Sequence, residues 1–278
     1  MIFDYLASRL EKFLNTWSPW RLRERIRAIN KEKEFHAFSV REMIAQRNRL
    51  FEMIELMGRL SKFDDGNSAE AVARQFRKSE SQFGQDILGL LLGRGKRGGF
   101  FVEFGACDGV RISNTYLFEK CFGWSGILAE PGREWRERLQ KNRSCHLETM
   151  CVWSKSGEHI PFYEADQNKL QSSAEAEHMQ INREALYKVE TISLHDMLRK
   201  YDAPKFIDFM SIDVEGSEFK ILEKFPFDVY SFGLVCIEHH LPEEEAQIKK
   251  LMDDNGYKQV LRSVSEFDGW YVPKSVAV

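Results

Sequence analysis

The sequence predicts an α/β fold with a mostly parallel sheet, preceded by a helical arm. Three observations support this prediction. From Ser79 onward, short apolar segments alternate with helical patterns, as strands and crossover helices do in parallel sheets. Several of these segments end at glycine or acidic residues. Before about Phe63 the pattern is helical with little Gly or Pro, and residues 64–68 (Asp-Asp-Gly-Asn-Ser) form a predicted linker.

Residues 1–75 are predicted to form the helical arm. Trp17-Ser18-Pro19-Trp20 interrupts it, because proline restricts its own backbone and that of its predecessor. Residues 21–50 contain nine Lys or Arg and four Glu. Three interpretations of the arm stay open: packing on its own domain or on a second subunit of a homo-oligomer, a short coiled coil, or peripheral contact with a membrane through the tryptophans and the arginines.

Residues 76–278 are predicted to form the main domain. Its expected strands are residues 99–104, 127–129, 150–152, 160–163, 206–212 and 234–237. Its expected helices run from Ser113 through Cys121, from Glu134 to Asn142, and from Pro242 until Gly256 stops the pattern. Residues 257–271 are expected to be a terminal antiparallel pair that turns at Asp268-Gly269, and the polar stretch 167–184 is expected to be a substrate loop.

The composition excludes several classes of protein. With 40 Lys or Arg and 43 Asp or Glu the net charge is -3, which provides no global basic field for nucleic acid. The five cysteines form no C-x-x-C pair, which is typical of a reducing compartment and of a chain without a structural metal. The pattern predicts no secretory signal, and we expect no spanning helix because no uncharged run approaches about 20 residues. We therefore expect a cytoplasmic protein, or one held at the inner membrane face by its arm.

The segment Val102-Glu103-Phe104-Gly105-Ala106-Cys107-Asp108-Gly109 is the strongest local signal for a ligand. It connects a predicted strand to a predicted helix, and Glu130 ends the next strand. Glycines there let the backbone approach a ligand, and an acidic strand end accepts hydrogen bonds from ribose hydroxyls. Glu103 and Asp108 place negative charge where a pyrophosphate would bind. S-adenosyl-L-methionine has a ribose, an ammonium and a sulfonium but no phosphate. It therefore suits this loop better than a dinucleotide does.

Four segments together resemble the FkbM-type S-adenosylmethionine-dependent methyltransferases. They are SQFGQD, GGFFVEFGACDGVRISNTYLFEK, GWSGILAEP and FMSIDVEGSEFKIL, and the resemblance extends over residues 81–271. It implies a class I methyltransferase (Rossmann-like) fold, a seven-stranded, mostly parallel sheet with helices on both faces and a terminal antiparallel strand. It also implies O-methylation of a small molecule or glycan, commonly a sugar or natural-product hydroxyl in polysaccharide or natural-product biosynthesis.

The resemblance also implies which residues hold the cofactor. Glu103 would reach the amino group, and Glu130 would hold the ribose. The turn around them would contact the methionine part, and side chains from two other segments would hold its carboxylate. Adenine would lie near residues 150–152. The complete expected set is Glu103, Gly105, Ala106, Asp108, Gly109, Asn114, Glu130, Cys151 and Gln85, with Gln82 as a further carboxylate contact.

Methyl transfer to oxygen needs a group that takes the acceptor's proton, and we expect it at the carboxyl ends of the fourth and fifth strands. The candidates there are Asp213, Glu215, Glu238, His239 and His240. We predict His239 as the base, because histidine titrates near neutral pH, with Asp213 and Glu238 as the other catalytic residues. A divalent metal such as Mg²⁺ held by Asp213, Glu238 and His239 is an alternative that is not predicted.

Two other functions stay open. One is a module that binds S-adenosylmethionine without chemistry and acts through its helical arm. The other is a nucleic-acid methyltransferase, suggested only by the basic residues 21–49, which lie outside the cofactor domain and alternate with glutamates. A solvated helix face explains that pattern more simply. We therefore expect no nucleic-acid partner.

Overall fold

The protein is described by a computed structural model that covers residues 75, 78–163, 187–239, 241–265 and 268–277. The predicted arm, apart from Gln75, lies outside the described residues, and so do the predicted substrate loop 167–184 and His240. None of the helices in these ranges is long and apolar enough to cross a membrane.

A seven-stranded sheet forms the centre of the domain, in the order β3-β2-β1-β7-β8-β10-β9. The five strands from β3 to β8 are parallel to their neighbours, and β10 is antiparallel to both β8 and β9. The class I methyltransferase sheet with its terminal antiparallel strand is thereby confirmed. The strands are β1 Phe100–Phe104, β2 Ser125–Ala129, β3 His146–Glu148, β7 Phe206–Ile212, β8 Ser231–Glu238, β9 Tyr257–Val260 and β10 Asp268–Pro273.

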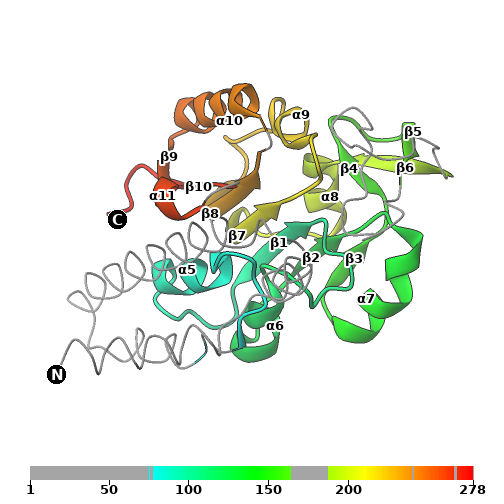
Figure 1. Cartoon of the computed structure of the whole chain (residues 1–278), viewed down its shortest axis with the longest axis horizontal. Coiled ribbons are helices and arrows are strands. Elements are labelled where there is room, and N and C mark those ends of the chain that lie inside the picture. Colours follow the sequence, from blue (N-terminus) through cyan, green and yellow to red (C-terminus); the bar gives the residue numbers. More distant parts are fainter. Residues whose placement is uncertain (1–74, 76–77, 164–186, 240, 266–267, 278) are drawn as a thin grey trace, which may run out of the picture.

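Helices cover both faces of this sheet (Figure 1). On one face pack α5 Gln85–Leu92, α6 Tyr116–Phe122 and α7 Arg136–Asn142, which follows a short 3-10 turn, η2 Arg133–Trp135. On the other face pack α8 Leu194–Lys200, α9 Glu218–Leu222 and α10 Pro242–Asp254. The strands alternate accordingly: Phe101 belongs to the first core and Val102 to the second. A short helix, α11 Arg262–Ser265, joins β9 to β10.

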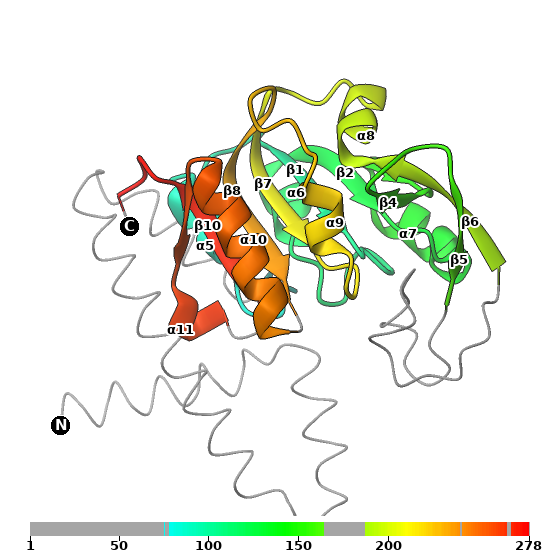
Figure 2. The same ribbon diagram turned by 90° about the horizontal axis from the view of Figure 1, so that it is seen from above.

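A second, three-stranded sheet lies at the end of the domain opposite to β9 (Figures 1 and 2). It consists of β4 Cys151–Trp153, β5 His159–Phe162 and β6 Tyr187–Ser193 in the order β4-β6-β5. The strand predicted at residues 150–152 is β4 of this sheet, whereas the third strand of the large sheet is β3. The reason is a turn between them, in which the buried Glu148 carboxylate accepts the backbone N–H groups of Thr149 and Met150.

The prediction of a turn at Asp268-Gly269 is wrong. The chain passes through α11 between β9 and β10, and Asp268 is the first residue of β10, paired with Glu238 of β8. The buried Asp268 carboxylate accepts hydrogen bonds from Gln85 Nε2, at 2.7 Å, and Trp270 Nε1, at 3.1 Å. These contacts hold a typical turn residue inside a strand.

Candidate functional site

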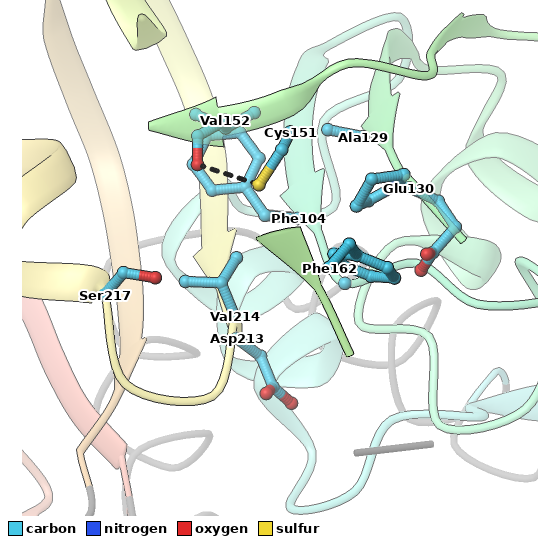
Figure 3. Close-up of a pocket in the computed structure, with 11 residues that line it drawn as sticks. Phe104, Ala129, Glu130, Cys151, Val152, Phe162, Asp213, Val214 and Ser217 are labelled. Atoms are coloured by element: carbon cyan, nitrogen blue, oxygen red, sulfur yellow. Dashed lines mark hydrogen bonds between the residues drawn. The ribbon is translucent and has the colours of Figure 1, made fainter. Parts of the chain in front are cut away.

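A pocket opens at the carboxyl ends of β1, β2 and β7, beside β4 of the small sheet. Figure 3 shows Glu130, from the end of β2, and Val214 and Ser217, from the loop after β7, on opposite sides of it. Open α/β sheets bind ligands at this edge. The lining residues are Phe104, Gly105, Ala129, Glu130, Pro131, Cys151, Val152, Phe162, Asp213, Val214 and Ser217.

The bottom of the pocket is backbone at Gly105. Its φ of +71° lies in the left-handed region, and a Cβ there would be 2.0 Å from the carbonyl oxygen of Asp213. Its N–H donates to the carbonyl oxygen of Ala129 at 3.1 Å. The loop after β1 therefore lies directly against the ends of β2 and β7, and only glycine fits.

Glu130 joins this loop to the turn after β2. The carboxylate is buried, and its Oε2 accepts the Cys107 N–H at 2.9 Å while Oε1 accepts the Gly132 N–H at 2.7 Å. Glu130 also lines the pocket, so a ligand that enters the pocket lies next to a carboxylate. Glu130 thus combines a fixed orientation with the ability to bind a hydroxyl pair.

The remaining walls are mostly apolar, with Phe104, Ala129, Val152 and Phe162 around the slot. Burial, followed by the charge of Glu130, raises the pKa of the Cys151 thiol to about 12, so this wall is uncharged at neutral pH. The ring of Phe162 lies 5.7 Å from that of Tyr187, whose hydroxyl accepts the Arg133 N–H at 3.1 Å. The small sheet is thereby fixed to the turn after β2.

Three carboxyl groups gather beside the pocket: Asp213 after β7, Glu215 in the same loop, and Glu238 at the end of β8. One oxygen from each lies within 4.8 Å of the others. Burial raises the pKa of Glu238 well above its usual range, and the charge of Asp213 and a hydrogen bond with it raise that pKa further. The Glu238 carboxyl therefore favours its protonated form more than an exposed carboxyl does, with Asp213 as its hydrogen-bond partner.

The loop that carries Asp213 and Glu215 is shaped by Glu218, the first residue of α9. Its buried carboxyl accepts the N–H of Val214 at 3.0 Å and that of Gly216 at 3.0 Å. Glu215 has a φ of +61°, which is uncommon outside glycine. Sequence reasoning did not assign Glu218 a role, although it lies inside the FMSIDVEGSEFKIL segment.

Residues 103–259, more than half of the chain, match the family model described as the methyltransferase FkbM domain. The chain belongs to this family. It is therefore an S-adenosylmethionine-dependent methyltransferase, as the sequence predicted.

Solved structures similar to this FkbM-family chain are distant. One is the methyltransferase FkbM from Methylobacillus flagellatus KT, with 15% identity and a TM-score of 0.42 over 79% of this chain and 58% of that chain. A SAM-dependent methyltransferase from Aquifex aeolicus has 14% identity and a TM-score of 0.32 over 64% and 82%. The precorrin-6y C5,15-methyltransferase from Geobacter metallireducens GS-15 has 10% identity and a TM-score of 0.37 over 67% and 85%. No curated protein matches the sequence.

The pocket of this FkbM-family chain fits S-adenosylmethionine. The apolar slot between Val152 and Phe162 suits a flat adenine, and Glu130 suits the ribose hydroxyls. Gly105 lines the pocket with backbone atoms alone. Asn114, which is not among the lining residues, has a buried Oδ1 atom without a hydrogen-bond partner among the described residues.

Of the predicted cofactor residues, Gly105, Glu130 and Cys151 come together in the pocket lining, and the others are not among the residues that line it. Glu103 is buried, and its carboxylate accepts the N–H of Asn114 at 2.7 Å, the hydroxyl of Ser113 at 2.9 Å and the hydroxyl of Thr115. The Asn114 amide donates to Ser211 of β7 at 2.9 Å. Glu103 thus positions the segment of Asn114, and its contact with the cofactor amino group stays a prediction.

The other predicted cofactor residues also have structural partners. Asp108 Oδ1 accepts the N–H groups of Val110 and Arg111, at 3.0 and 2.9 Å, and stabilises the turn after Ala106, which is buried. Gly109 packs on the side chain of Arg143. Gln85 donates to Asp268 and accepts the Phe83 N–H at 2.9 Å. Cofactor contacts by these residues stay predictions, and so does that of Gln82.

His239, predicted as the base, directly follows Glu238 and is half-buried. His239 is not among the described residues that line the pocket. The clustered acidic residues are Asp213, Glu215 and Glu238, whereas the alternative metal site contains His239 in place of Glu215. Three carboxylates are ligands that a divalent cation prefers. Metal binding nevertheless stays unpredicted, because acidic side chains at this spacing are common without an ion.

Proposed function

We propose that this methyltransferase transfers the methyl group to the hydroxyl oxygen of a small molecule or glycan, with a sugar as the expected acceptor. The supporting observation is the place of Asp213. It lines the cofactor pocket, and its carboxylate belongs to the group formed with Glu215 and Glu238. A proton acceptor beside the methyl donor is what an alcohol needs, since a hydroxyl keeps its proton at neutral pH.

S-adenosylmethionine, when bound, supplies a methyl group on a positively charged sulfonium. The protein's own contribution is orientation and proton transfer. An Asp213 carboxylate oxygen accepts the hydroxyl proton of the acceptor, which raises the nucleophilicity of that oxygen. The hydrogen bond between Glu238, whose pKa is raised by burial and by Asp213, and the Asp213 side chain keeps the Asp213 carboxylate oriented. Glu215 offers a further acceptor for neighbouring hydroxyl groups of a polyol.

The cluster of Asp213, Glu215 and Glu238 also argues against a nucleic-acid acceptor. The carboxylates of Asp213 and Glu215, one oxygen of each lying within 4.8 Å of the other, would repel phosphates close to the reacting atoms. A neutral polyhydroxylated acceptor meets no such repulsion. His239 stays the alternative base, because it follows Glu238 directly at the same end of β8.

The experiment is methyl transfer from S-adenosylmethionine labelled with ¹³C in its methyl group. The acceptors are neutral sugars, nucleotide sugars and phenolic natural products, and NMR of the product distinguishes an oxygen-bound methyl from a carbon-bound one. We expect a methyl ether on a sugar hydroxyl. A carbon-bound or nitrogen-bound label would contradict the proposal. Binding of S-adenosylhomocysteine without turnover on any acceptor would favour the non-catalytic module.

A further inference from the structure

Arg143 lies behind the cofactor loop, directly after α7, and its side chain is fully buried. No sequence motif marks it. Its guanidinium packs over the ring of Phe101 of β1, with 5.4 Å between the guanidinium carbon and the ring centroid. A buried arginine is costly unless most of its donors are used. The question is therefore which groups use them.

Every nitrogen of the guanidinium has an acceptor in the segments that follow β1. Nε donates to Glu119 of α6 at 2.8 Å, and Nη1 donates to the carbonyl oxygen of Gly109 at 2.9 Å and to Ser113 Oγ at 3.1 Å. Nη2 donates to Thr115 Oγ1 at 3.0 Å. One planar group thus fixes the last glycine of the cofactor loop and both hydroxyls that flank Asn114.

The same two hydroxyls donate to the Glu103 carboxylate, whose Oε2 lies 3.9 Å from Arg143 Nη1. Burial raises the pKa of Glu103, and the charge of Arg143 opposes that rise. Arg143 and Glu103 therefore hold Ser113 and Thr115 from two sides. The Asn114 N–H is bound to Glu103, so the orientation of the Asn114 side chain depends on this arrangement.

The geometry points to Arg143 as a positioning residue for S-adenosylmethionine binding, which acts by holding Gly109 and residues 113–115, the segments that the sequence assigns to the methionine part of the cofactor. It does not line the pocket, so its effect passes through these neighbours. A lysine could not replace it, because a single ammonium cannot reach four acceptors arranged around a plane. The neighbouring Asn142 supports the same loop, since its Nδ2 donates to the carbonyl oxygen of Asp108 at 2.8 Å.

The test is calorimetry with S-adenosylhomocysteine on Arg143→Lys, with Arg138→Lys as the matched control on the exposed side of α7. Circular dichroism and thermal unfolding confirm that each variant is folded at the temperature used. We expect Arg143→Lys to raise the dissociation constant about tenfold or more and Arg138→Lys to leave it unchanged. A folded Arg143→Lys protein with the wild-type dissociation constant would overturn the proposal.

Thr115→Val keeps the side-chain shape and removes only the hydroxyl that joins Arg143 to Glu103, so it tests the proposal even if Arg143→Lys does not fold. We expect it to weaken binding several-fold, and unchanged binding would contradict the role of Arg143. With an acceptor in hand, Arg143→Lys should raise the KM for S-adenosylmethionine while kcat at saturation stays close to wild type. A fall in kcat alone would also contradict it. Binding needs no acceptor, so these results do not depend on the O-methylation proposal.

Discussion

The main-chain carbonyl oxygen of Asp213 occupies the space into which a side chain on Gly105 would extend. A Cβ at residue 105 would lie 2.0 Å from that oxygen. The loop after β1, on the cofactor side, and the loop after β7, which carries the proposed base, therefore touch backbone to backbone. A change in one of them displaces the other.

Gly105→Ala is expected to abolish cofactor binding and to lower the free energy of unfolding by at least about 2 kcal/mol, since it adds a clash to an unfavourable φ. Gly98→Ala is the control, because Gly98 has a similar φ of +66° but open space around its Cβ position. It should cost about 1 kcal/mol and leave binding intact. Calorimetry and chemical denaturation measure both effects. Equal behaviour of the two variants would show that the contact with Asp213 is unimportant.

Glu130→Ala is expected to weaken S-adenosylhomocysteine binding at least about tenfold, because it removes the predicted acceptor for the ribose and frees the N–H groups of Cys107 and Gly132. Glu137→Ala, on the exposed surface of α7, should bind like wild type. The measurement is isothermal calorimetry. Equal affinities of wild type and Glu130→Ala would remove Glu130 from the cofactor site.

Asp213→Asn is expected to lower kcat by about 10² to 10⁴, because an amide cannot accept the acceptor's proton. His239→Gln is its comparison, and we expect a smaller loss because His239 is outside the described pocket lining. Single-turnover rates with the labelled methyl donor give both values. The reverse ranking would assign the base to His239, as the sequence pattern first indicated.

The stability of the protein should fall as pH rises, in part through Glu218. Burial raises the pKa of this carboxyl to about 8, whereas in the unfolded chain it ionises near its ordinary value of 4.5. The folded state therefore binds the proton more tightly, and the stabilisation is complete below about pH 4.5 and is lost as pH rises toward 8. The slope from this group is at most about 1.4 kcal/mol per pH unit.

Glu218→Gln should reduce this slope, because its amide oxygen still accepts from the loop but does not ionise. Urea denaturation at pH 5, 6, 7 and 8 measures it. Glu223→Gln, an exposed residue at the end of the same helix, serves as the control and should keep the wild-type slope. A Glu218→Gln protein with an unchanged slope would refute the assignment. Burial raises the pKa of Asp86 to about 6. Asp86 should therefore add a similar but smaller slope to the stability of wild type and of Glu218→Gln alike.

The sequence pattern predicts the functional residues at the strand ends, but it does not predict the hydrogen bonds of Arg143 behind the cofactor loop. Glu130 and Asp213 were predictable because each directly follows an apolar strand, and such residues meet at one edge of a parallel sheet. Arg143 was not, because its acceptors at Gly109 and Glu119 are 34 and 24 residues away and form no repeating pattern.

The two misplaced features have a similar origin. The sequence pattern does not indicate β3, because β3 has only three residues. Directly after it, the Glu148 carboxylate accepts a backbone N–H in the turn that leads to β4 of the small sheet. Asp268 was placed in a turn because aspartate favours turns, but its partner Gln85 lies 183 residues away. In both places a buried carboxylate with distant or backbone partners overrides the local preference of the sequence.

The position of β10 decides how this protein can be shortened. The family match ends at residue 259, whereas β10 begins at Asp268 and pairs with β8. A recombinant fragment of residues 103–259 would expose the edge of β8 and would lack both α5 and the Gln85–Asp268 hydrogen bond. An uncovered strand of mostly apolar residues is a site for intermolecular pairing. The catalytic unit for expression therefore extends from α5 through β10, well beyond the boundaries that similarity alone defines.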